Sequence, residues 1–362
     1  MLQTVQVAVS GATFHFDKLY TYLLPPRLEG AVFVGSMVLV PFGKGNKPRA
    51  GVVLALGEVE EAGRCKELFD AAPEEARLTD ELLGLVHFLK ERTFCTWYEA
   101  VRAIIPYGAQ YRPASTENGP RLQKQLQRHT EPLYELAGPL PEKPKPTEKQ
   151  KAAAAALENG PLPASALAEI GLSRPVLDNL CEKGVLRKRQ VDKTVDLYAG
   201  IPRSEEPVVL SEDQQKVFAG LAAQMESGRA SAALLYGVTA SGKTLVFLKL
   251  IQRCLELGRT ALVLVPEISL TPQMIRRLKA SFGERVAVQH SALSHTERLL
   301  QWRMIQTGGA DIVVGTRSAV FAPLSNLGLI VVDEEQEHTY QSESAPRFDA
   351  RQVAKRRAAD HN

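Results

Sequence analysis

The stretch GVTASGKT, residues 237–244, decides the fold of the C-terminal part of the chain. It follows the apolar run ASAALLY and precedes TLVFLKLIQRCLEL, whose apolar spacing is that of a helix. Glycines allow a tight turn whose N–H groups face a phosphate, and the N-terminus of the next helix adds positive potential. The sequence therefore predicts a phosphate-binding loop of the GxxxxGKT pattern, placed between a strand and a helix.

Each polar group of this loop has an expected role. We expect Lys243 to contact the β- and γ-phosphates of ATP and Thr244 to place its hydroxyl on Mg²⁺. The other loop positions expected to bind ATP are Gly237, Thr239, Ser241 and Gly242. The interpretation without function is an ordinary glycine-rich turn between a strand and a helix.

A second motif, LIVVDEEQ, completes the predicted nucleotide site. Asp333 stands at the carboxyl end of an apolar strand, where open α/β sheets bind their ligands. We expect Asp333 to hold Mg²⁺ and Glu334 to orient or deprotonate the attacking water. Upstream, in LSEDQQKVF, the amide of Gln214 can pair with an adenine edge, with Gln215 as the alternative. Spacing alone favours an ordinary exposed helical glutamine there.

The region from Ile201 onward alternates apolar runs with helical segments. ASAALLYG, TALVLVPE, VAVQHS, ADIVVGTR and LGLIVVDEE are each near-continuous and apolar, as buried parallel strands are, so the pattern predicts a doubly wound α/β lobe. The loops VPEISLTPQ and GTRSAVFAP follow two of these strands. Thr271, Arg317 and Ser318 in them are candidates to bind a phosphate backbone. The alternative is polar capping of ordinary turns.

The N-terminal region has a different pattern. Residues 1–57 contain four β-rich runs separated by turn clusters, and a helix begins after Thr79 as its N-cap. A second helix, YEAVRAIIP, ends at Pro106, so we expect a small α+β unit. Residues 113–120 (PASTENGP) have the composition of a loop, and residues 138–146 (GPLPEKPKP) that of an extended linker.

Between these regions, three short helical segments begin near Thr147 and precede the basic stretch KGVLRKRQVDKTVDLY, which we interpret as a two-stranded ribbon. Three helices followed by a ribbon describe a winged helix. The alternative is a generic three-helix packing module.

Composition narrows the remaining possibilities. The chain of 362 residues is long enough for two or three domains, and its formal net charge of +3 means that a nucleic-acid surface must be local. Its four cysteines contain no CxxC pair, which argues against a zinc site or a disulfide framework. We find neither a signal peptide nor a membrane span and expect a soluble, cytoplasmic protein without a membrane partner.

Together, in this order, the motifs GVTASGKT, LVPEISLTPQ, HSALSHTERLLQWR, GTRSAVFAPLSNLGLIVVDEEQ, DKLYTYLLP and GSMVLVPFGK resemble one family, the primosomal protein N′ (PriA-type) DNA helicases. The resemblance covers essentially the whole chain. It implies a DNA-binding domain for the 3′ end of a leading strand (residues 1–110), a linker (111–146), a winged helix (147–200) and a RecA-like helicase lobe 1 (201–362).

The resemblance also implies binding residues. Tyr20, Tyr22 and the PFGK segment with Lys44 match the family's 3′-end pocket, while Thr21 stands where some members carry an aspartate. HTYQSESAPRF, which contains Tyr340, is similar to the aromatic-rich loop that links DNA to the ATP site. In that region Gln336 and Pro346 depart from the family pattern.

The family's activity is ATP-driven 3′-to-5′ unwinding and the loading of primosome proteins at stalled forks. Its expected partners are forked and single-stranded DNA, primosome proteins and single-strand-binding proteins. The family's second lobe and zinc module, which would hold zinc, have no counterpart after DEEQ. We therefore expect an incomplete lobe that binds DNA and ATP without unwinding. The alternatives are a non-catalytic DNA-binding scaffold and a P-loop phosphotransferase.

Overall fold

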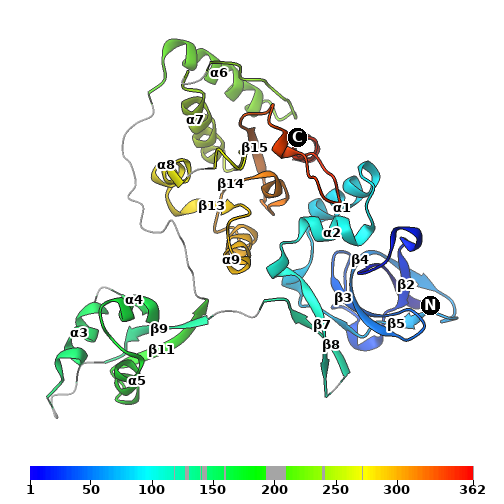
Figure 1. Cartoon of the computed structure of the whole chain (residues 1–362), viewed down its shortest axis with the longest axis horizontal. Coiled ribbons are helices and arrows are strands. Elements are labelled where there is room, and N and C mark those ends of the chain that lie inside the picture. The colour runs from blue at the N-terminus through cyan, green and yellow to red at the C-terminus, as the bar shows by residue number, and fades with distance from the viewer. Residues whose placement is uncertain are drawn as a thin grey trace. The chain divides into compact units, whose positions relative to one another are not determined.

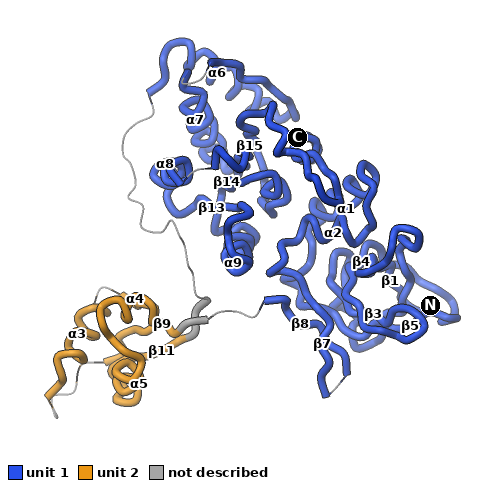
Figure 2. Tube along the Cα trace, viewed as in Figure 1, with its two compact units in different colours: residues 1–126, 196–362 blue, residues 127–195 orange. Residues whose placement is uncertain are grey.

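The computed structural model describes residues 1–117, 119–126, 130–138, 140, 145–158, 160–192, 209–238, 241–270 and 272–361. The chain divides into two compact units, one of residues 1–126 with 196–362 and the other of residues 127–195 (Figure 2). Each unit has its own hydrophobic core.

The N-terminal region is built on a six-stranded sheet of order β5-β2-β1-β4-β3-β6 (Figure 1). Its strands are β1 (Leu2–Val9), β2 (Tyr20–Leu23), β3 (Met37–Phe42), β4 (Lys47–Val59), β5 (Lys66–Glu67) and β6 (Asp70–Ala71). The four longer strands coincide with the four predicted β-rich runs, which confirms that part of the prediction. Valines of β1, β3 and β4 bury one face of the sheet around Tyr22.

Two helices follow this sheet, α1 (Asp80–Arg92) and α2 (Trp97–Ile104). The Thr79 side chain accepts the Leu82 N–H at 3.3 Å, which confirms the predicted N-cap. Thr96 and Glu99 form a reciprocal capping box at the start of α2. Short 3-10 turns complete the region: η1 (Phe14–Phe16), η2 (Pro26–Leu28), η3 (Glu74–Ala76) and η4 (Tyr107–Ala109).

The prediction of a loop over residues 113–120 is wrong. Strands β7 (Tyr111–Thr116) and β8 (Gly119–Lys124) pair there as an antiparallel hairpin. The turn-forming composition belongs to the tip of this hairpin, where Gly119 has a φ of +97° that suits glycine. Asp70 of β6 accepts the Leu122 N–H at 2.8 Å, so the hairpin is tied to the main sheet.

The second unit contains a three-stranded sheet of order β10-β9-β11 with three helices. Its elements are β9 (Thr130–Leu136), α3 (Glu148–Ala156), β10 (Leu162–Pro163), α4 (Ala164–Glu169), α5 (Arg174–Glu182) and β11 (Leu186–Asp192). The three predicted helices are present. The first strand of the predicted ribbon, β11, pairs with β9 from the stretch interpreted as linker. Residues 193–200, the rest of that ribbon, lie outside the described residues.

The C-terminal region of the first unit is a parallel sheet of order β13-β14-β12-β15 with helices around it (Figure 1). The strands are β12 (Thr260–Leu264), β13 (Val286–Gln289), β14 (Ile312–Gly315) and β15 (Leu327–Val332). The helices are α6 (Glu212–Glu226), α7 (Lys243–Glu256), α8 (Pro272–Phe282), α9 (His295–Gln306) and α10 (Ala350–His361). The 3-10 turns are η5 (Gly283–Arg285), η6 (Arg317–Phe321) and η7 (His338–Tyr340).

One predicted strand of this sheet is wrong. Residues 230–237, the run ASAALLYG, form no strand, and the side chains of Leu234 and Tyr236 are 78% and 91% exposed. An apolar run becomes a strand only where its backbone pairs with a neighbour, and this run forms no ladder. Composition indicated the strand, but pairing decides it.

The two regions of the first unit share one hydrophobic core, which includes Leu85 and Leu89 of α1 together with Leu262 and Val313 of the parallel sheet. Across this contact, the fully buried Arg357 of α10 pairs with Glu81 of α1. Helices α1 and α2 thus connect the two regions: α2 packs on β1 and β4 of the N-terminal sheet and on η6, and α1 packs on α10.

Candidate functional site

The carboxyl ends of three parallel strands meet at one edge of the C-terminal sheet. In the pairing register Leu264 lies opposite both Gly315 and Val332. The Asp333 N–H donates to the Leu264 carbonyl at 2.9 Å, and the Val265 N–H donates to the Gly315 carbonyl at 3.0 Å. The loops that follow these strands therefore begin side by side, where doubly wound sheets bind their ligands.

The GxxxxGKT stretch lies at the start of α7. Gly242 is its N-cap with a φ of +80°, and a Cβ at this position would collide with the Gln214 amide nitrogen. Lys243 is the first residue of the helix, and its Nζ donates to the carbonyls of Gly237 and Val238 at 2.7 and 3.2 Å. The Lys243 ammonium group is thus hydrogen-bonded to carbonyls of its own loop. Thr239 lies outside the described residues.

Gln214 lies beside this loop and uses both ends of its amide. Its Oε1 accepts the Ser211 N–H at 2.9 Å in the capping box of α6, and its Nε2 donates to the Ser241 carbonyl at 3.0 Å. In this arrangement the side chain joins α6 to the loop. An adenine base could pair with the Gln214 amide only by displacing its contacts with Ser211 and Ser241.

The acidic pair follows β15 directly. Burial raises the pKa of Asp333, the Glu334 N–H at 3.1 Å opposes that rise, and the neighbouring Lys243 ammonium also lowers the pKa. The acid and the loop lysine are therefore close enough to interact. Glu334 has a left-handed backbone with φ +45°, and its carboxylate accepts the Gln336 amide at 2.7 Å. A hydrogen bond within the DEEQ motif thus holds the carboxylate of Glu334, the expected general base.

The remaining residues predicted on this lobe differ in exposure. Ser318 is exposed, whereas Arg317 donates to the carbonyl of Gln341 at 3.0 Å. Tyr340 is only 1% exposed, and its hydroxyl donates to the carbonyls of Asp333 and Leu264 at 2.6 and 3.0 Å. The ring is therefore packed inside the protein and is not presented to a ligand. Thr271 lies outside the described residues.

The N-terminal sheet carries a separate cavity of about 600 Å³, within the range of small-molecule sites. Tyr20, Thr21 and Tyr22 all line it, as do residues that the sequence analysis did not select: Gly11, Ala12, Thr13, Phe16, Pro41, Phe42, Gly43, Arg64 and Lys66. Lys44 is exposed in the adjacent turn and is not among the lining residues. No local signal marks Phe16, Arg64 or Lys66, because the folded sheet brings them to the tyrosines.

The cavity walls are aromatic and ordered. The rings of Tyr20 and Phe42 meet edge to face with centroids 5.1 Å apart, and the Tyr22 hydroxyl donates to the Pro41 carbonyl at 3.2 Å. Burial and then the Tyr20 hydroxyl raise the pKa of Tyr22 to about 12. Burial and then Asp17 raise the pKa of Tyr20. Both phenols stay neutral near pH 7, so the walls suit a flat base. Arg64 and Lys66 add positive charge to the lining, and the Lys66 ammonium donates to the Gly43 carbonyl at 2.8 Å.

Among the described residues no helix is long and apolar enough to cross a bilayer. Nor does this part of the chain hold any group of three or more His, Cys, Asp or Glu side chains that could bind a metal ion.

Comparison with known families agrees with this geometry. Residues 5–106 match the model of the 3′ DNA-binding domain (3′BD), and residues 211–357 match that of the DEAD/DEAH box helicases. These two matches define the class, a helicase-type protein with a 3′ DNA-binding domain.

The relatives define the family more narrowly. The replication restart protein PriA of Bacillus subtilis (strain 168) is 32% identical, over 99% of this chain and 52% of its own length. PriA of Chlamydia trachomatis is 31% identical over 94% of this chain and 45% of its own length. PriA of Treponema pallidum is 42% identical over 49% of this chain and 27% of its own length. The chain is a homologue of the PriA replication restart proteins. It spans about half the length of the first two.

Proposed function

We propose that this chain is the fork-binding and ATP-binding portion of a 3′-to-5′ replication-restart DNA helicase. The observation that carries the proposal is the common core of the first unit, in which α1 and α2 join the region with the aromatic cavity to the region with the phosphate-binding motif. A helicase that recognises a DNA end and moves along DNA needs a DNA-end site and an ATP site in the same protein.

On the DNA side, the aromatic cavity takes the 3′-terminal nucleotide of a strand at a fork. Tyr20 and Tyr22 bound the base, Thr21 lies at the terminal sugar, and Lys44 in the adjacent turn attracts phosphate. The volume of the cavity and its two lining cations support this assignment.

On the nucleotide side, Lys243 leaves the two loop carbonyls and binds the β- and γ-phosphates. Backbone N–H groups of Gly237, Thr239, Ser241 and Gly242 surround the phosphates, and Gln214 exchanges its contact with Ser241 for the adenine edge. Every one of these exchanges replaces a contact within the protein by a contact to ATP.

The donor set at the carboxyl edge fits a magnesium ion, because Thr244 and Asp333 offer the hydroxyl and carboxylate oxygens that this ion prefers. When bound, Mg²⁺ neutralises phosphate charge. Glu334 orients or deprotonates the attacking water after Gln336 releases its carboxylate.

The single strand runs across the lobe past Thr271, Arg317 and Ser318. Arg317 connects this path to the 338–341 segment, whose Tyr340 holds the Asp333 carbonyl. Tyr340 thus contributes from beneath the DNA surface. This chain of contacts supports coupling between the strand and the ATP site.

The proposed organisation is residues 1–110 for the 3′ end, 147–200 as a winged helix and 201–362 as a RecA-like lobe 1. Of the predicted linker, residues 111–146, the hairpin of β7 and β8 belongs to the first unit and β9 belongs to the second. Primosome proteins and single-strand-binding proteins are the proposed protein partners. The basic strand β11, with Arg187, Lys188 and Arg189, gives the winged helix a surface for DNA or for a partner.

A second candidate function, a DNA-binding scaffold without hydrolysis, is favoured by one observation. Lys243, Gln214 and Glu334 are all engaged within the protein. In this function the chain binds forks and presents primosome proteins without hydrolysing ATP.

The test is a binding titration of the chain with forked DNA that bears or lacks a free 3′-hydroxyl on the leading strand, with and without Mg-ATP, for wild type and Lys243→Ala. Preference for the free 3′ end supports the cavity assignment. Nucleotide dependence that disappears in Lys243→Ala supports the ATP site. Equal affinity for both forks together with no nucleotide uptake would contradict the proposal, and duplex unwinding by this chain would contradict the expected lack of that activity.

A further inference from the structure

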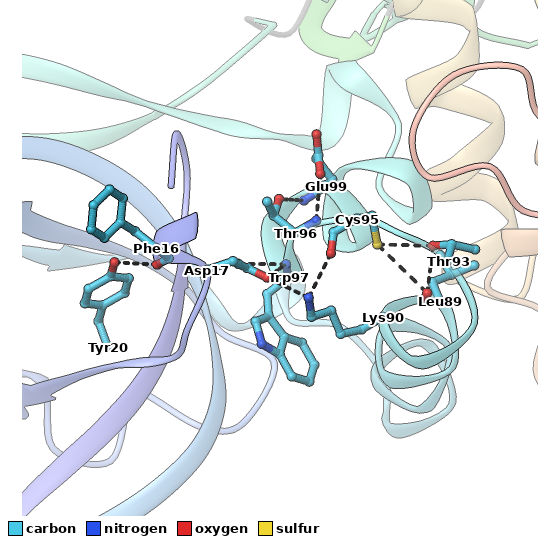
Figure 3. Close-up of polar contacts among 10 residues, drawn as sticks. All are labelled: Phe16, Asp17, Tyr20, Leu89, Lys90, Thr93, Cys95, Thr96, Trp97 and Glu99. Carbon is cyan, nitrogen blue, oxygen red and sulfur yellow. Dashed lines mark hydrogen bonds and ion pairs between the residues drawn. The ribbon is translucent and has the colours of Figure 1, made fainter. Parts of the chain in front are cut away.

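Asp17 is adjacent in sequence to Phe16, which lines the aromatic cavity, yet its carboxylate points the other way (Figure 3). Its side chain is 4% exposed and directed at helices α1 and α2. It is therefore not placed to meet a ligand in the cavity.

Two elements distant in sequence bind this carboxylate. The backbone N–H of Trp97, the first residue of α2, donates to Oδ1 and Oδ2 at 3.1 and 3.2 Å. The Lys90 ammonium of α1 lies 2.8 Å from Oδ2 and also donates to the Cys95 carbonyl at 2.9 Å. A carboxylate at a helix N-terminus with a paired cation is a strong, directional anchor.

On its other side, the same turn is fastened to the cavity. The Tyr20 hydroxyl donates to the Phe16 carbonyl at 2.7 Å. The η1 turn, residues 14–16, thus lies between a tyrosine of the cavity and the anchor at Asp17 (Figure 3).

Phe16 itself cannot be held by packing, because its side chain is 70% exposed. An exposed ring keeps a fixed place only if its backbone is fixed by other contacts. Here those contacts are the Tyr20 hydroxyl on one side and Asp17 on the other.

The helices, by contrast, do not depend on Asp17. Thr96 and Glu99 already cap α2, and both helices contribute buried residues to the common core. Removal of the carboxylate should release the turn more than it disturbs the helices.

We propose that Asp17 is a positioning residue of the 3′-end cavity, which holds the η1 turn so that Phe16 forms one wall against the terminal base. This inference rests on the proposed function of the cavity. Asp17 acts through Phe16 and does not itself contact DNA.

The test compares Asp17→Ala and Asp17→Asn with Asp80→Asn as a matched control. Asp80 is 93% exposed and only loosely paired with Arg77, at 3.7 Å. The whole chain is titrated with a 5′-labelled single strand that has a free 3′-hydroxyl and with the same strand ending in a 3′-phosphate. The measured quantity is the ratio of the two dissociation constants.

For Asp17→Ala we expect affinity for the free 3′ end to fall roughly tenfold, the cost of one lost base–aromatic stack. Affinity for the blocked strand should stay the same, so the ratio approaches one. Asp17→Asn keeps an acceptor for the Trp97 N–H and loses the charge that pairs with Lys90, so it should give an intermediate ratio. Asp80→Asn should behave as wild type.

The ratio separates positioning from general structural damage. Loss of folded protein, measured by circular dichroism, lowers binding of both strands and leaves the ratio unchanged. An Asp17→Ala protein with the wild-type ratio would overturn the proposal. If that variant does not fold, a wild-type ratio in Asp17→Asn overturns it. Wild type without any preference overturns the cavity assignment and this inference together, whereas a preference that persists in both variants removes only the role of Asp17.

Discussion

The guanidinium group of Arg357 is completely buried and donates to both carboxylate oxygens of Glu81, at 2.6 and 3.2 Å, although the two residues are 276 positions apart. The same group donates to the Val320 carbonyl of η6 at 2.9 Å. One side chain near the end of the chain therefore joins α1 of the 3′ DNA-binding domain to a turn of the helicase-type lobe.

Replacement of Arg357 by alanine should lower the free energy of unfolding by about 3–5 kcal/mol, because it leaves the Glu81 carboxylate partly buried without its charged partner. Urea denaturation measures this change. The control is Arg356→Ala, which removes the exposed pair with Asp360 four residues further on and should cost less than about 0.5 kcal/mol. Equal losses in the two variants would contradict the importance of the buried pair.

Lys243→Ala should weaken Mg-ATP binding by at least roughly tenfold, since a charge-assisted contact to phosphate is lost. Affinity for a free DNA 3′ end should not change, because the cavity lies on another sheet. Fluorescent ATP analogues and labelled DNA measure the two affinities. Lys249→Ala, on the outer face of α7, is the control and should leave both affinities intact. Unaltered ATP affinity in Lys243→Ala would count against the loop as the site.

Asp333→Asn tests the consequence of the raised pKa of this acid. A carboxyl whose folded-state pKa lies above its ordinary value binds its proton more tightly in the folded protein, so the free energy of unfolding falls as pH rises through that pKa. Above it, without nucleotide, the neutral asparagine should therefore make the protein more stable than wild type. Magnesium-dependent ATP binding should fall at the same time. Thermal melts across pH measure the change in stability, and calorimetry measures the change in ATP binding. An Asp333→Asn protein less stable than wild type above the pKa would contradict the stability prediction.

Tyr340→Phe removes only the hydroxyl that joins the carbonyls of Asp333 and Leu264. The Asp333 carbonyl loses this donor, whereas the Leu264 carbonyl still accepts the Asp333 N–H, so we expect a stability loss of about 1–3 kcal/mol. The buried ring remains in place, so the surface that faces DNA is unchanged. Reduced ATP affinity with unchanged single-strand affinity is the expected pattern. The reverse pattern would indicate that Tyr340 acts on DNA.

Much of this fold is predictable because burial imposes a period on the sequence. The valines of β1 and the apolar runs of β12 and β14 indicate their strands directly, and Thr79 indicates the start of α1. Residues 230–237 show the limit of that reasoning, since their composition suits a buried strand but strand formation depends on a partner elsewhere in the chain.

The candidate sites divide in the same way. The phosphate-binding loop and Asp333 are local sequence patterns. In the structure the loop leads into α7, which packs on β12 and β15, and Asp333 follows β15 directly. Asp17 gains its position from residues such as Trp97, 80 positions away, and the Tyr340 hydroxyl contacts the carbonyl of Leu264, 76 positions away. Such long-range contacts leave no local period or motif in the sequence.

The position of β15 at the end of the four-stranded sheet has a consequence for the protein in solution. Among the described strands, β15 pairs only with β12. The run that contains Leu234 and Tyr236, next to the phosphate-binding loop in the sequence, stays exposed. An unpaired strand edge together with an exposed hydrophobic segment favours association between molecules. Higher protein concentration should therefore give larger particles, and a nucleotide or peptide that orders residues 230–237 along β15 should keep the chains apart.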